Sequence, residues 1–213
     1  MKKISIVLSL IFVVAIILLA ILFTQNLNDP KNTLSVLSPE ETAVRHAREM
    51  TVAGYHIDPN TVEAIQKVEI NDMVLVLVQY NAYQIDGETE LCEMLLEVEK
   101  KLLNQWEAKG GSGLCHKISD PDNTVPISIV SSYGVTSFLE SGYSTAFGYL
   151  RNEQITEVVV TWDDGLIQHA SISERTYLTA RKGGSYVDKI ETYNDLGEII
   201  FEKQYPTEEE FNP

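Results

Sequence analysis

The sequence contains no charged residue between Ile4 and Phe23, and only Ser5 and Ser9 are polar in this stretch. A helix of twenty residues rises about 30 Å, which matches the hydrocarbon core of a bilayer. Buried helices of soluble proteins seldom run beyond about 10–14 apolar residues without a charge. The missing charges therefore predict a transmembrane helix at 1–24.

The usual marks of processing are also missing around this helix. Its exit, Leu19–Gln25, lacks the A-x-A-like pair of small residues that a signal peptidase requires, and no cysteine is present for lipid attachment. No glutamate lies inside the apolar run, as a pilin-like subunit would have. We expect an uncleaved signal anchor, with Lys2 and Lys3 in the cytoplasm and the rest of the chain outside. Secretion after cleavage is the alternative.

Basic residues are scarce beyond the anchor. The first 24 residues hold two lysines and no acid, which leaves 14 basic against 31 acidic residues and a net charge of −17. A surface this acidic repels nucleic acid and anionic lipid headgroups, so we expect no nucleic-acid partner. One interpretation is that the negative charge keeps the protein soluble. The alternative is that it recruits a cationic partner or Ca²⁺.

Only two cysteines occur, Cys92 and Cys115, and they do not form a C-x-x-C motif. Outside a membrane, such a pair predicts a structural disulfide. If the two cysteines face each other, the midpoint falls within Leu102–Gln105, a plausible hairpin loop. The competing prediction is a helix, because the apolar residues between Leu91 and Trp106 follow helical spacing. We favour the hairpin.

The chain shows no repeat with a solenoid period and no low-complexity tract, so we expect ordinary domains. Polar residues follow the anchor, and the segment around Asp120–Asn123 has the composition of a linker. The predicted division is an anchor at 1–24, a tether at 25–37, an α+β module at 38–118, a linker at 119–126, a β-sandwich-like module at 127–206 and an acidic tail at 207–213.

The first module is predicted to begin with a helix at Ser38, because Pro39 suits the first helical position and Glu41 completes a capping box. The helix should continue to Val52. Strands at Thr61–Ile70 and Met73–Tyr83 follow, and the unbroken apolar run Val74–Val78 predicts a strand covered on both faces. One helix followed by an antiparallel meander is an α+β pattern. Lys109–Gly113 is predicted to be a flexible loop.

The second module contains short strand-like segments with turn signals every 8–12 residues, which is typical of a small β-sandwich. The predicted strands are 128–132, 143–150, 155–162, 166–173, 177–181, 186–193 and 198–204, with turns at Asp163–Gly165 and Asn194–Gly197.

Three stretches of the second module carry a resemblance. They are Tyr143…Phe147-Gly148-Tyr149-Leu150, Val158-Val159-Val160-Thr161-Trp162-Asp163-Asp164-Gly165 and Ile190-Glu191-Thr192-Tyr193-Asn194-Asp195-Leu196-Gly197. A glycine-aromatic strand followed by V-x-W-x-D-G and Y-x-D-x-G hairpins resembles uncharacterised membrane-anchored proteins of Gram-positive bacteria. The resemblance covers roughly residues 60–205. It implies an architecture and brings no assigned activity.

Motifs for catalysis and for metal binding are absent from the sequence. The four histidines, His46, His56, His116 and His169, show no H-x-x-x-H spacing, and we expect each to lie on the surface. No G-x-S-x-G elbow is present. We interpret Asp163–Gly165 as a hairpin turn rather than a metal site.

Two further groups of residues have alternatives that we judge weaker. Asp120, Asp122 and Asn123 have the alternating oxygen ligands of a Ca²⁺ loop but lack its glycine and glutamate, so linker chemistry is favoured. Five aromatic residues have rings suited to stacking on sugars, although core packing explains most of them: Trp106, Trp162, Tyr133, Tyr143 and Tyr149.

These observations predict a non-catalytic protein of a Gram-positive cell surface. It would bind or assemble with another envelope protein, a peptide or a wall glycan, without a cofactor. The alternatives are an extracellular hydrolase and a Ca²⁺-dependent carbohydrate-binding protein.

Overall fold

A computed structural model of the chain describes residues 37–52, 54–70, 73–84, 87–101, 105–117, 125–135 and 142–205. One helix and thirteen strands lie in this part, and all of its strand pairs are antiparallel. The prediction of antiparallel β structure with a single helix is therefore confirmed for these residues.

Several predicted segments lie outside the described residues. They are the anchor at 1–24, nearly all of the tether at 25–37, residues 119–124 of the linker and the acidic tail at 207–213. Among the residues that the structure does describe, no helix is both long and apolar enough to span a bilayer.

The helix α2 (Pro39–Glu49) begins as predicted. The backbone N–H of Glu41 donates to Ser38 Oγ at 3.1 Å, and the Ser38 N–H donates to the Glu41 carboxylate at 2.8 Å. This reciprocal pair is the predicted capping box. The helix ends three residues earlier than expected, at Glu49. Ala43 and Ala47 are fully buried against the first sheet.

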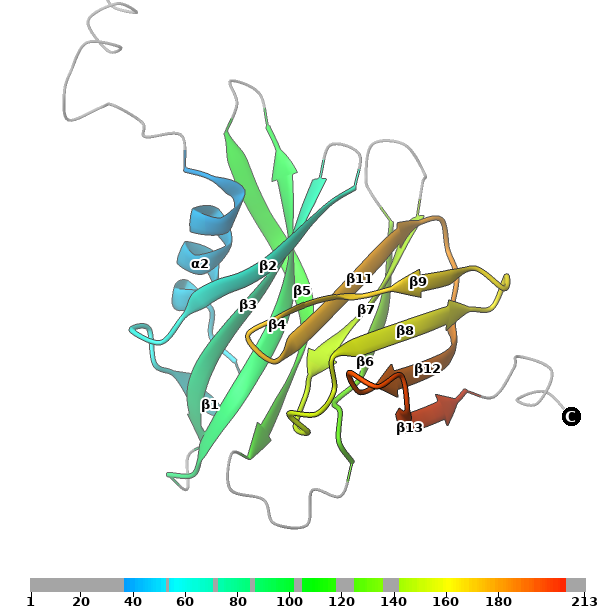
Figure 1. Cartoon of the computed structure of the whole chain (residues 1–213). Coiled ribbons are helices and arrows are strands. Elements are labelled where there is room, and N and C mark those ends of the chain that lie inside the picture. Colours follow the sequence, from blue (N-terminus) through cyan, green and yellow to red (C-terminus); the bar gives the residue numbers. More distant parts are fainter. Residues whose placement is uncertain are drawn as a thin grey trace, which may run out of the picture. The chain divides into compact units, whose positions relative to one another are not determined.

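The first sheet has five strands, and β3 is its central strand (Figure 1). β3 pairs with β4 along one edge and with both β1 and β2 along the other, and β5 extends the sheet beyond β4. The strands are β1 (Tyr55–Ile57), β2 (Glu63–Ile70), β3 (Met73–Gln84), β4 (Thr89–Lys100) and β5 (Trp106–Lys117). Residues Val74–Val78 are buried, which confirms the prediction that both faces of this strand are covered.

β4 and β5 form the predicted hairpin, and the alternative helix over Leu91–Trp106 is wrong. Cys92 lies directly opposite Cys115, and the two sulfur atoms are at disulfide distance. The helical spacing is overridden because β4 pairs with β3 along one edge and with β5 along the other, which satisfies its backbone. The two cysteines thus lie where the predicted disulfide between Cys92 and Cys115 requires them.

The expected flexible loop at Lys109–Gly113 is a second wrong prediction, since these residues lie within β5. A side chain at Gly111 would collide with the backbone carbonyl of Leu95, and one at Gly113 would approach the carbonyl of Glu93. The glycines therefore allow β5 to approach β4 closely, a use of glycine that composition does not distinguish from a loop.

Two four-stranded sheets follow along the chain. The second sheet has the order β10-β11-β7-β6 and contains β6 (Val130–Val135), β7 (Gly142–Tyr149), β10 (Ser171–Ser173) and β11 (Thr176–Lys182). The third sheet has the order β13-β12-β8-β9 and contains β8 (Glu157–Trp162), β9 (Ile167–His169), β12 (Val187–Tyr193) and β13 (Ile199–Gln204). β6 begins two residues later than the strand predicted at 128–132.

The strand predicted at 166–173 passes between sheets. Its first part, β9, pairs with β8 in the third sheet, and its second part, β10, pairs with β11 in the second sheet. The change occurs at Ala170, whose N–H donates to Val158 O at 2.9 Å. The single strand predicted at 166–173 is thus two short strands, which connect the edge of the third sheet to the edge of the second.

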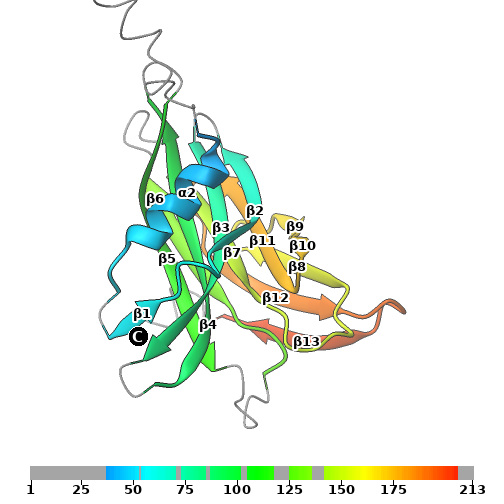
Figure 2. The same ribbon diagram turned by 90° about the vertical axis from the view of Figure 1, so that its left-hand side faces the viewer.

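Figures 1 and 2 show α2 lying against the first sheet and the other sheets following on its far side. Three apolar clusters hold these layers together. One lies between α2 and the first sheet, and another between the second and third sheets. The remaining cluster joins β2, β3 and β4 of the first sheet to β7 and β11 of the second: Ile70, Met73, Leu75, Leu77, Leu95, Tyr143, Phe147 and Leu178. The second sheet is consequently covered on both faces, and residues of both predicted modules share a core.

Candidate functional site

The histidines occupy different environments. His56 and His169 are exposed, as predicted, and His169 Nδ1 lies 2.6 Å from Glu157 Oε1. His46 is half-buried on α2. The prediction for His116 is wrong, because its side chain is only 8% exposed and lies beneath the second sheet.

Asp163, Asp164 and Gly165 form the predicted tight turn between β8 and β9. Gly165 has a φ of 82°, a conformation that favours glycine, and Trp162 N–H donates to Leu166 O at 2.9 Å across the turn. The described residues contain no cluster of three or more histidine, cysteine, aspartate or glutamate side chains with metal-binding geometry. The weaker Ca²⁺ candidates, Asp120, Asp122 and Asn123, lie outside the described part.

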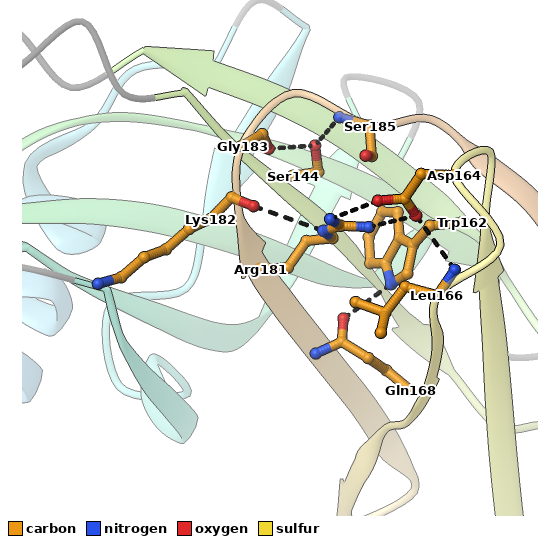
Figure 3. A network of polar contacts seen from close by, with 9 residues as sticks. All are labelled: Ser144, Trp162, Asp164, Leu166, Gln168, Arg181, Lys182, Gly183 and Ser185. Atoms are coloured by element: carbon orange, nitrogen blue, oxygen red, sulfur yellow. Dashed lines mark hydrogen bonds and ion pairs between the residues drawn. The ribbon is translucent and has the colours of Figure 1, made fainter.

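The turn is tied to the second sheet by one arginine (Figure 3). Both terminal nitrogens of Arg181, on β11, donate to the Asp164 carboxylate at 2.7 Å, a bidentate geometry. The guanidinium also lies over the Trp162 ring, 5.7 Å from its centroid. Hydrogen bonding to Arg181 lowers the pKa of Asp164 to about 2, so this carboxylate stays ionised at neutral pH.

Further hydrogen bonds fix the segments on either side of this arginine (Figure 3). Trp162 Nε1 donates to Gln168 Oε1 at 2.7 Å, which fixes the buried indole. On the other side, Ser144 Oγ donates to Gly183 O at 3.1 Å and accepts from Ser185 N at 2.8 Å. The chain is thereby held where it leaves β11 and approaches Tyr186.

The segments next to this network carry three exposed apolar side chains: Leu166 (44% exposed), Ile167 (59%) and Tyr186 (62%). Tyr186 O accepts from Asp163 N at 2.9 Å, and Ile167 lies opposite Thr161. We call these three residues the corner patch. Interfaces are enriched in tyrosine and arginine, and a rigid support lowers the entropy lost on binding. The corner patch is the first candidate site.

The second candidate is a buried acid–base pair. Glu93 on β4 is fully buried, and its Oε2 lies 3.8 Å from Nδ1 of His116 on β5. The His116 ring packs on Tyr149 of β7 with a centroid distance of 5.0 Å. Among the described residues, neither oxygen of Glu93 and neither ring nitrogen of His116 makes a well-formed hydrogen bond.

Burial shifts both members of this pair toward their neutral forms. It raises the pKa of Glu93 to about 8, although weak hydrogen bonding from the Gln79 amide and the charge of Arg151 oppose the shift. Burial also lowers the pKa of His116 to about 4, and here the charge of Arg151 acts in the same direction. At neutral pH both side chains are uncharged. A fully buried carboxyl has no surface available for a substrate, so the geometry does not support a hydrolytic role.

Other sequence candidates have structural roles in the described part. Trp162 and Tyr143 are buried in the apolar clusters, Trp106 is half-buried there, and Tyr149 contacts His116.

A comparison of the chain with protein-family models, with curated proteins and with solved structures finds no match. The candidate sites therefore depend on the geometry alone.

Sequence reasoning missed both the corner patch and the buried pair. If Cys92 is placed opposite Cys115, Glu93 and His116 become diagonal neighbours on the sheet face away from the cysteines. The strand register therefore contained the information needed to predict that these two side chains meet. Glutamates at 93, 97 and 99 indicated a solvated face, and nothing in the sequence showed that another sheet covers it.

Proposed function

We propose that this protein is a non-catalytic binding or assembly protein of a Gram-positive cell surface. Its N-terminal helix at 1–24 would anchor it in the membrane, and the remainder would face outward as an α+β module (38–118) and a β-sandwich-like module (127–206) joined at 119–126. The proposal is supported by the apolar run at Ile4–Phe23 and by the paired cysteines, because disulfides persist in oxidising compartments.

The corner patch is the observation that carries the binding proposal. A tyrosine and two aliphatic side chains are exposed on segments next to a turn whose carboxylate is already satisfied by an arginine. The patch therefore offers apolar surface to a partner. The Arg181–Asp164 ion pair does not have to break when a partner binds. The class of partner is another envelope protein, a peptide or a wall glycan.

The bonding around the patch also favours binding without rearrangement. Asp164 fixes the turn because its Oδ1 accepts from Leu166 N at 3.1 Å, and Arg181 joins that turn to the second sheet. A partner would thus meet side chains on a preformed backbone, and little ordering of the chain would be needed on association.

The test is capture of the partner with the tagged, full-length protein from its own envelope, using matched variants. Ile167→Ser combined with Tyr186→Ser should abolish capture. Leu196→Ser should retain it, because Leu196 is 77% exposed at the opposite end of β12. Equal capture by all three proteins would exclude the corner patch. A mature chain that begins near Gln25, by intact mass, would exclude the anchor.

A further inference from the structure

The covered face of the first sheet changes character along its length. Leu75, Leu77 and Leu95 pack there against Phe147 of β7. Beyond Leu77 and Leu95 the next residues on the same face are Gln79 and Glu93, which lie opposite each other on β3 and β4, with His116 on β5. A cluster of polar side chains from three strands thus replaces the apolar contact between the two sheets.

This cluster is buried but poorly satisfied. Within the described residues, no well-formed hydrogen bond reaches five of its polar atoms: Gln79 Nε2, both Glu93 oxygens and both His116 ring nitrogens. A buried polar group without a partner destabilises the folded state, and a buried unpaired charge does so far more. The cluster is tolerable only while both Glu93 and His116 are neutral.

The disulfide prevents β4 and β5 from separating to let water reach the cluster. Cys92 and Cys115 immediately precede Glu93 and His116, and their side chains point to the helix-covered face. The bond therefore holds β4 and β5 together at the residues that carry the pair. A charge on Glu93 is relieved by water only if the second sheet moves away from the first.

We propose that Glu93 and His116 form a proton-dependent latch between the first and second sheets, closed while both side chains are neutral and opened when either becomes charged. The latch is independent of the proposed binding function and would govern how firmly the two halves of the described fold are packed.

The protonation behaviour supports the latch and gives its pH window. The pKa of Glu93 is raised from 4.5 to about 8, so the unfolded chain loses this proton first and folded-state stability falls as pH rises between these values. The pKa of His116 is lowered from 6.5 to about 4, so stability falls as pH drops through that range. Between pH 6.5 and 8 only the Glu93 effect operates.

The remaining groups around the pair do not reverse this behaviour. The charge of Arg151 acts on both pKa values, and its effect on Glu93 is smaller than that of burial. Arg175 lies over Tyr149, 5.1 Å from the ring centroid, and bonds to Leu150 O, Arg151 O and Glu153. The pKa values of Tyr80 and Tyr177 are raised mainly by burial, so both phenols stay neutral in this range.

The test compares the full-length wild type with Glu93→Gln and with Glu90→Gln. Glu90 is the matched control, because it is also buried on β4 but accepts a hydrogen bond from Gln84. E93Q should raise Tm by about 5 °C or more at pH 9 and by less than about 2 °C at pH 5, because 1 kcal/mol shifts Tm by about 2–4 °C at this size. E90Q should not produce this pH-dependent gain.

Hydrogen exchange then separates a latch from a local defect. At pH 9, corrected exchange at 93–96 and 143–149 should be several-fold faster in the wild type than in E93Q, while 158–160 in the third sheet should not differ. The latch would be overturned if E93Q and the wild type had the same Tm at pH 9. It would also be overturned if E93Q had the higher Tm but exchange in the facing strands were no faster in the wild type. If E93Q does not fold, Glu93→Leu carries the same predictions.

Discussion

Glu90 and Glu93 lie three residues apart on β4, and both are buried, yet they serve opposite faces of the first sheet. On the helix-covered face, Glu90 accepts from Gln84, and the neighbouring residues form an apolar cluster around the disulfide. On the face covered by the second sheet, Glu93 receives no well-formed hydrogen bond among the described residues. The helix-covered face thus combines an apolar cluster with a hydrogen-bonded glutamate, whereas the other face combines an apolar region with a pair that responds to protons.

The largest expected effect comes from creating a cavity in the apolar contact between the first and second sheets. Phe147→Ala should lower the free energy of unfolding by about 3–5 kcal/mol, since Phe147 is fully buried between β7 and the first sheet. Phe147→Leu should cost less, because most of the volume is kept. Urea unfolding monitored by fluorescence provides the measurement.

The same variant tests whether the two halves share a core. The loss should be equal when unfolding is followed through Trp106 alone, in β5, or through Trp162 alone, in β8, using Trp→Phe backgrounds. A loss seen by only one tryptophan would mean that the two halves unfold independently, and the comparison of faces would fail.

Removing the disulfide tests the helix-covered face. Cys92→Ala with Cys115→Ala opens a loop with a sequence separation of 23, and stability should fall by about 3 kcal/mol in the chain-entropy model. Urea unfolding of the variant against the oxidised wild type gives this value. The wild type in reductant is the control and should show the same loss. If thiol labelling of denatured, non-reduced protein modifies both cysteines, the bond does not exist.

The smallest expected effect concerns α2 itself. Ser38→Ala removes the side chain that accepts from Glu41 N and should cost about 1 kcal/mol by thermal unfolding. Ser38→Asp restores an acceptor at the same position and should recover most of the loss. Equal destabilisation by both substitutions would show that capping does not hold the helix on the sheet.

The sequence predicted the local features that single segments determine. The capping box at Ser38, the buried run Val74–Val78, the turn at Asp163–Gly165 and the Cys92–Cys115 hairpin all follow from a few neighbouring residues. The predicted domain boundary at 119–126 and the membrane anchor stay predictions, because those residues lie almost entirely outside the described part.

The features that sequence reasoning missed depend on contacts between distant segments. Gly111 has the composition of a loop, and its role appears only once β5 lies against β4. His116 is buried because β7 covers it, and nothing near residue 116 encodes that contact. The corner patch likewise needs Arg181 and Asp164 to meet from separate sheets. Local chemistry predicted the strands, and the packing of sheets determined the candidate sites.

The most direct test of the account is the titration of Glu93 itself. Carbon-13 NMR of glutamate carboxyl carbons in the full-length protein should reveal one resonance with a midpoint near pH 8, and this resonance should be missing in E93Q. Such a carboxyl would be neutral at pH 7, as the closed latch requires. If every glutamate carboxyl instead titrates below about pH 5.5, close to the ordinary range, Glu93 is charged in the folded protein and the account is contradicted.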